Sequence, residues 1–140
     1  MRIVIDNGHS GSPDPGAVNL GAGLRESDIT LAVAKLVENY LLDAGHEVKL
    51  TRTEWEQEET DDLRYRTSMA NDWGADIFVS LHCNSAASPS AKGYEVWTSP
   101  GNTLGDKLAT CIYGQVAAEF PDRVGRADYF DGDPDKESRF

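Results

Sequence analysis

The chain has 140 residues, a formal net charge of −11 and an apolar content of 39%. This length predicts one domain with a core of its own, and the acidic balance argues against nucleic acid or an anionic membrane as a partner, because both are bound by basic surfaces. No stretch approaches the roughly 18 consecutive apolar residues of a membrane span, and the N-terminus has no signal-peptide pattern.

The first apolar run, Ile3-Val4-Ile5, is short and is followed by polar residues and a glycine. This pattern predicts a buried strand that ends in a loop. Residues 10–23 are rich in Gly, Ser, Pro and Asn without periodicity, which predicts a long loop of the kind that usually carries function. A helix is then expected between Ser27, a good N-cap, and Gly45, which ends it.

The remaining elements alternate in the same way. They are, in chain order, a strand at 47–51, a helix capped by Thr60-Asp61-Asp62 and ended by Gly74, a strand at 77–81, a loop at 85–91, a strand at 93–98 and a helix from Leu104 that is ended by Phe120-Pro121. This order predicts an α/β fold, with a mostly parallel (mixed) sheet flanked by helices. The side chains expected in its core are Leu36, Leu41, Ile77, Val79, Leu108 and Ile112.

Two histidines follow apolar strands. His9 lies in a Gly-rich turn after the first strand, and His82 closes the strand at 77–81. The carboxyl ends of strands in such sheets share one rim, so we expect the two side chains on the same rim. Glu26, just before the expected helix, is the candidate carboxylate. Two imidazoles and a carboxylate form a three-ligand zinc set with an open fourth position, which is typical of hydrolytic sites.

Each of these residues alone has an ordinary structural interpretation. A loop histidine is usually a surface residue, a histidine on an apolar strand is usually in the core, and a carboxylate at a helix N-terminus favours the helix dipole. His46 is expected at the surface. Cys83 adjoins His82, but successive strand side chains point to opposite faces, so we do not expect it as a ligand. With Cys111 it is expected to be a free thiol.

A wider pattern contains these residues. It comprises Ile3-Val4-Ile5-Asp6-Asn7-Gly8-His9, Asp14-Pro15-Gly16-Ala17, Glu26, Gly45-His46-Glu47-Val48, Thr51-Arg52, Leu63-Arg64-Tyr65-Arg66, Ala70-Asn71, Ala75-Asp76, Ser80-Leu81-His82-Cys83-Asn84 and Gly93-Tyr94-Glu95-Val96. On these residues the chain resembles the zinc-dependent N-acetylmuramoyl-L-alanine amidases of the type-3 amidase family, from residue 1 to about residue 126.

The resemblance implies a single amidase domain over residues 1–140, of phosphorylase/hydrolase-like fold, with His9, Glu26 and His82 as zinc ligands. It also implies hydrolysis of the amide bond between N-acetylmuramic acid and L-alanine in bacterial peptidoglycan, as in autolysins and endolysins. Such enzymes act on the cell wall, whether extracellular, periplasmic or delivered by phage. Peptidoglycan is then the expected partner.

The resemblance also leads us to expect a shortened domain. The family's domain continues with a strand and a Val-Glu-x-Gly-Phe segment whose glutamate is the general base, whereas Glu137 stands here in a polar tail without an expected strand. The identity of the general base is therefore open. Glu95 is an alternative candidate, and its ordinary interpretation is a structural carboxylate. The rival function is an inactive module that binds zinc or peptidoglycan. A missing strand predicts self-association through an uncovered sheet edge.

Overall fold

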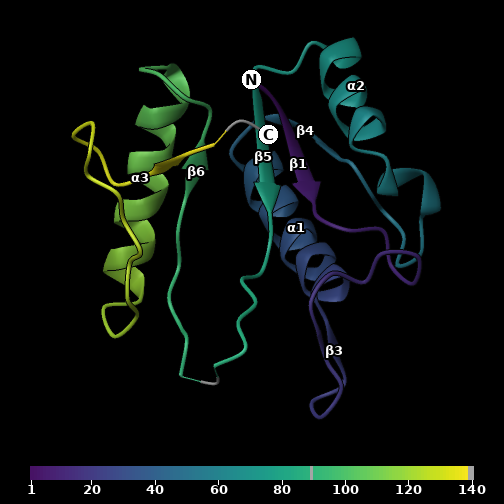
Figure 1. Cartoon of the computed structure of the whole chain (residues 1–140). Coiled ribbons are helices and arrows are strands. Elements are labelled where there is room, and N and C mark those ends of the chain that lie inside the picture. The colour runs from purple at the N-terminus through teal and green to yellow at the C-terminus, as the bar shows by residue number, and fades with distance from the viewer. Residues whose placement is uncertain (89, 139–140) are drawn as a thin grey trace. The chain divides into compact units, whose positions relative to one another are not determined.

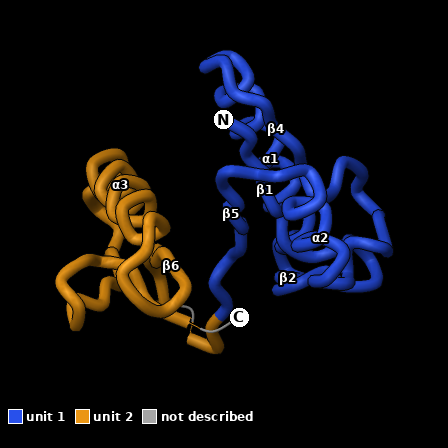
Figure 2. The backbone as a smooth tube through the Cα atoms, turned by 90° about the horizontal axis from the view of Figure 1, so that it is seen from above, with its two compact units in different colours: residues 1–85 blue, residues 86–140 orange. Residues whose placement is uncertain are grey.

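The computed structural model describes residues 1–88 and 90–138. The chain divides into two compact units, Met1–Ser85 and Ala86–Phe140, which Figure 2 colours blue and orange. We call them the first and the second unit, and the expectation of one domain over residues 1–140 stays a prediction. Among the described residues, no helix combines the length and the apolar character that crossing a membrane requires.

A three-stranded parallel sheet forms the centre of the first unit (Figure 1). Its middle strand is β1 (Arg2–Asn7), with β4 (Glu47–Leu50) on one side and β5 (Ile77–Leu81) on the other. Asn7 at the end of β1 pairs with Leu81 at the end of β5. The parallel sheet with flanking helices confirms the expected α/β fold class, and it brings the carboxyl ends of β1 and β5 together.

Helix α1 (Glu26–Asp43) packs against β1 and β4. Leu31 and Ala34 on its inner face are 0% exposed, whereas Leu36 is 59% exposed. The expectation that Leu36 is buried is therefore wrong. Residues five positions apart on a helix point about 140° apart, so Leu36 and Leu41 cannot both face the sheet. The other expected core residues are partly buried, and Leu41, Ile77 and Val79 pack against the core of the first unit.

The helix expected after the Thr60-Asp61-Asp62 cap is confirmed, and it ends before Gly74 as expected. A 3-10 turn, η1 (Glu58–Asp61), comes first, and helix α2 (Leu63–Trp73) follows it. Asp62 has extended backbone angles and caps α2, because its side chain accepts a hydrogen bond from the Arg64 N–H at 2.8 Å. The cap is thus a single aspartate that interrupts the helical pattern after the first turn.

The segment expected as a loop at 10–23 contains part of a hairpin. Strands β2 (Val18–Asn19) and β3 (Leu24–Arg25) pair in antiparallel fashion and lead directly into α1. The N-cap is therefore Arg25 rather than Ser27, and the helix begins at Glu26, two residues earlier than expected, without a side-chain cap. Strands of two residues are too short to show an alternating pattern, which explains why the sequence does not reveal them.

The second unit contains helix α3 (Leu104–Glu119) and two short parallel strands, β6 (Trp97–Thr98) and β7 (Lys136–Glu137). The tail expected to lack a strand therefore forms one, and Glu137 lies in it. Backbone hydrogen bonds hold β7, from Lys136 N–H to the Val96 carbonyl and from Ser138 N–H to the Thr98 carbonyl, both 2.9 Å long. The strand is polar, so apolar patterning could not predict it.

Candidate metal centre

The chain turns sharply at Gly8 and His9, directly after β1. The Gly8 N–H donates to the Leu81 carbonyl at 3.1 Å, and the Thr30 hydroxyl donates to the Gly8 carbonyl at 2.8 Å. His9 has a φ of +70°, and no other non-glycine residue in the described part of the chain has a positive φ. The turn is thus held between the end of β5 and helix α1, and it carries the first imidazole in an uncommon backbone conformation.

Glu26 is the first residue of α1 and is 5% exposed. Its two carboxylate oxygens accept hydrogen bonds from the Ala17 N–H at 2.9 Å and the Cys83 N–H at 2.6 Å. Burial alone would raise the pKa of Glu26, but these hydrogen bonds and the two neighbouring histidines lower it below its usual value. The structure therefore holds a buried carboxylate in its ionised form, which is the form that binds a metal.

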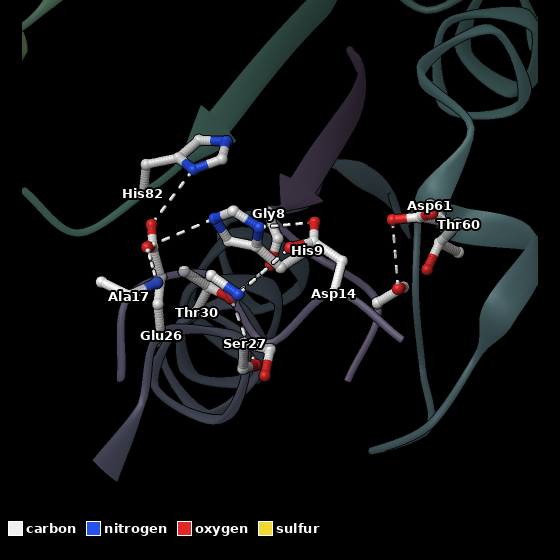
Figure 3. Close-up of polar contacts among 12 residues, drawn as sticks. Gly8, His9, Asp14, Ala17, Glu26, Ser27, Thr30, Thr60, Asp61 and His82 are labelled. Atoms are coloured by element: carbon white, nitrogen blue, oxygen red, sulfur yellow. Dashed lines mark hydrogen bonds and ion pairs between the residues drawn. The ribbon is translucent and has the colours of Figure 1, made fainter. Parts of the chain in front are cut away.

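His9, Glu26 and His82 converge at the ends of β1 and β5, as Figure 3 shows. Glu26 Oε2 lies 3.2 Å from His9 Nε2, and Glu26 Oε1 lies 3.1 Å from His82 Nδ1. The two rings meet edge to face, with centroids 5.0 Å apart. All three residues belong to the first unit, and the shared rim expected for the two histidines is confirmed.

This donor set fits a zinc ion. One donor atom from each of the three side chains can be chosen so that all lie within 4.8 Å of one another. A tetrahedral ion about 2.0–2.1 Å from each donor would separate neighbouring donors by about 3.3 Å. The two imidazoles lie at 3.2 Å and 3.1 Å from the two different oxygens of Glu26, so both reach the carboxylate within that range. Two imidazole nitrogens and one carboxylate oxygen are also ligand types that zinc prefers.

Two glycines let the backbone approach the imidazoles closely. A β-carbon on Gly8 would collide with the ring of His82. A β-carbon on Gly16 would lie 2.6 Å from His9 Nε2 and 2.8 Å from Glu26 Oε2, and Gly16 also has a φ of +65°. Both positions therefore require glycine, one for space and the other for space and backbone conformation. Both glycines belong to the matching motifs, but residue types alone do not predict these contacts.

A buried arginine supports the same region. Arg52 is 0% exposed and its guanidinium donates to backbone carbonyls of His9 at 3.0 Å, Ser27 at 2.7 Å, Glu54 at 2.9 Å and Trp55 at 3.2 Å. These bonds join the turn at His9 to the first turn of α1. Sequence reasoning placed Arg52 only in a matching motif, because nothing in the pattern shows which carbonyls a buried guanidinium will reach.

The other candidates lie outside the donor group. Cys83 touches Glu26 through its backbone N–H, and burial, together with the Glu26 charge, raises the pKa of its thiol. Glu95 lies in the second unit, where Lys136 Nζ is 2.6 Å and Arg126 Nε is 3.7 Å from its carboxylate. The hydrogen bond from Lys136 lowers the pKa of Glu95 despite partial burial. His46 precedes β4 and is not in the group either.

Comparison with known proteins agrees with this geometry. A family model described as N-acetylmuramoyl-L-alanine amidase matches residues 3–130. The sporulation-specific N-acetylmuramoyl-L-alanine amidase of Bacillus subtilis strain 168 is 40% identical over 127 residues, which are 88% of this chain and 47% of that protein. The endolysin of Bacillus phage SPP1 is 36% identical over 123 residues, covering 81% of this chain and 42% of the phage protein.

A solved structure gives the same result. The N-acetylmuramoyl-L-alanine amidase AmiC2 of Nostoc punctiforme superimposes with a TM-score of 0.81 at 30% identity, and the match covers 100% of this chain and 70% of that one. The chain spans less than half the length of the curated relatives described above.

Proposed function

The chain belongs to the N-acetylmuramoyl-L-alanine amidase family, and from that premise we propose that it hydrolyses the amide bond between N-acetylmuramic acid and L-alanine in bacterial peptidoglycan, with zinc held by His9, Glu26 and His82. The observation that supports this most is the convergence of the three donors on one buried carboxylate. Its site of action would be the cell wall.

Each residue of the site has its own role in the proposed reaction. When bound, zinc supplies Lewis acidity for the scissile carbonyl and for the attacking water. His9 and His82 would each supply an imidazole nitrogen, and Glu26 would supply the carboxylate of the set. His9, Glu26 and His82 would hold the ion, and a three-ligand set of this kind leaves a position for water or substrate. The hydrogen bonds from Ala17 and Cys83 keep the Glu26 carboxylate in place.

A general base must also take a proton from the water and return it to the leaving amine. Glu95 is a poor candidate, because Lys136 and Arg126 hold its carboxylate and its pKa is lowered. This observation favours a second candidate function, a module that binds zinc or peptidoglycan without cutting it.

The test is the appearance of free N-terminal alanine when the purified, zinc-loaded chain is incubated with peptidoglycan. We expect release that stops with a chelator, returns with zinc and is lost in His82→Ala. His46→Ala is the matched control, since it removes the one histidine outside the donor group, and it should retain full activity. Release that persists in His82→Ala would contradict the proposed site. Full zinc binding without release would favour the binding module.

A further inference from the structure

We propose that Asp14 is a positioning residue for the metal centre. It holds the His9 ring by Nδ1, so that Nε2 is the nitrogen presented to the metal. This inference rests on the proposed zinc site. It assigns to Asp14 a role that none of the three donor residues has. Figure 3 shows Asp14 on one side of the His9 ring and Glu26 on the other.

Asp14 is itself fixed at three atoms. Its Oδ2 lies 2.6 Å from His9 Nδ1, and its Oδ1 accepts the Gly16 N–H at 3.2 Å. Its backbone carbonyl accepts the Ser10 N–H at 3.1 Å. The segment from Ser10 to Gly16 is therefore closed on itself, and it returns a carboxylate to the histidine from which the loop departs.

The backbone conformation of His9 explains why neighbouring groups must fix its ring. With a φ of +70°, His9 adopts a conformation that non-glycine residues rarely take and that persists only where the surroundings impose it. Arg52 binds its carbonyl, Asp14 binds one side of its ring, and the backbone of Gly16 packs against the other ring atoms. The position of the imidazole is thus determined from three directions.

The contact with Asp14 affects which nitrogen of the His9 ring carries the proton. A neutral imidazole carries one N–H and one lone pair, and a carboxylate at one nitrogen selects the N–H there. Asp14 at Nδ1 therefore favours the tautomer whose lone pair is on Nε2, and a metal ion bound there would replace the contact that Nε2 makes with Glu26 Oε2 at 3.2 Å in the metal-free chain. Carboxylates placed in this way orient metal-binding histidines and raise their affinity as ligands.

The two histidines differ in their contacts and in their exposure. The Nδ1 of His82 faces Glu26 at 3.1 Å, and its side chain is 49% exposed, against 20% for His9. Within the described residues, no second carboxylate is bonded to the His82 ring. The loss of Asp14 should therefore affect the less exposed of the two imidazole ligands.

A purely structural interpretation of the contact is that it closes the loop and nothing more. That interpretation predicts a loss of stability in Asp14→Asn with no change in the affinity for zinc beyond that loss. The measurement must therefore report on the metal and on the ring, rather than on activity. Both readouts below remain valid if the protein proves to have no amidase activity.

The variant is Asp14→Asn, which keeps the size of the side chain and an oxygen for the Gly16 N–H. The matched control is Asp62→Asn in the same unit, because Asp62 also accepts one backbone N–H and its loss removes the same charge. Zinc affinity is measured by competition with a chromogenic chelator. We expect about 10- to 100-fold weaker binding in Asp14→Asn, and a change under twofold in the control.

The second readout is the ¹⁵N spectrum of the wild-type imidazoles with one equivalent of zinc, because in the metal-free protein Glu26 Oε2 lies 3.2 Å from His9 Nε2 and competes with Asp14 for the ring proton. We expect the proton of His9 on Nδ1. Circular dichroism in chelator tests whether Asp14→Asn folds, and if it does not, the wild-type spectrum decides alone. A proton on Nε2 of His9, or an affinity in folded Asp14→Asn within threefold of the wild type, would overturn the proposal.

Discussion

At the scale of single residues, glycine determines how close the backbone comes to the metal donors. Gly16 and Gly23 have nearly the same backbone angle, with φ of +65° and +64°, but different surroundings. A β-carbon on Gly16 would lie against His9 and Glu26, whereas one on Gly23 would meet no atom within 4 Å. The pair therefore separates the cost of backbone strain from the cost of disturbing the site.

We predict that Gly23→Ala lowers the free energy of unfolding by about 1 kcal/mol, because alanine is strained in the left-handed region, and that Gly16→Ala lowers it by more, because its methyl group also meets His9 and Glu26. Only Gly16→Ala should weaken zinc binding, by at least about tenfold, since its methyl group displaces a donor side chain. Denaturant melts in chelator and zinc competition give the two quantities. Equal zinc affinity in both variants would show that the donors can move aside.

The three ligands could be predicted from the sequence because of where they stand. His9 and His82 follow strands, and the rule for parallel sheets places such residues on one rim. The contact between Asp14 and His9 could not be predicted, because it depends on a left-handed turn that the residue types do not reveal. The four carbonyl partners of Arg52 likewise come from three separate segments.

At the scale of elements, the order of the helices and longer strands along the chain could be predicted from the apolar periodicity. Which face of a helix is buried, and at which residue an element ends, could not. Helix α1 carries apolar residues on two sides, so counting them could not show which side faces the sheet. Leu31 and Ala34 are buried, while Leu36 and Tyr40 are exposed. The short strands β2, β3 and β7 have two residues each, which is fewer than any periodic signal needs. The strand expected at 93–98 is also shorter in the structure, where only Trp97–Thr98 forms β6.

Leu31 and Leu36 give a test of the inner face of α1 with one residue type on one helix. Leu31→Ala should lower the free energy of unfolding by roughly 2–5 kcal/mol, because it opens a cavity in the core. Leu36→Ala is the control and should change it by less than about 0.5 kcal/mol, because Leu36 is 59% exposed. Denaturant melts in chelator measure both. Similar losses in the two variants would contradict the assigned face.

In the second unit, the bond between Glu95 and Lys136 predicts a pH dependence. The pKa of Glu95 is lowered in the folded chain, chiefly by this hydrogen bond, from an ordinary value of 4.5. The ionised carboxylate therefore stabilises the unit above about pH 4.5, and this contribution is lost as the pH falls toward the folded pKa. The difference in melting temperature between wild type and Glu95→Gln should shrink over that range.

The control for this experiment is Glu119→Gln, which removes an exposed carboxylate at the end of α3 in the same unit. It should show no comparable change in its difference from the wild type between neutral and acidic pH. If the melting difference of Glu95→Gln were constant across the range, the carboxylate would not gain its stability from the ionised form.

At the scale of the whole molecule, the fold and the family agree, and the site lies within one compact unit. The first unit holds all three donors together with Asp14, Gly16 and Arg52. In its three-stranded sheet, β4 and β5 each pair on one side with β1. Self-association through such an edge stays a prediction, and sedimentation at several concentrations would contradict it by showing a single monomeric species.

The central claim is that two histidines and one glutamate, without sulfur, bind zinc. Zinc K-edge X-ray absorption of the protein with one equivalent of zinc tests it most directly. We predict nitrogen or oxygen neighbours at about 2.0–2.1 Å, scattering from two imidazoles, and the loss of one imidazole in His82→Ala. A sulfur neighbour at about 2.3 Å would assign the metal to Cys83 or Cys111, and an unchanged imidazole signal in His82→Ala would remove that residue from the site.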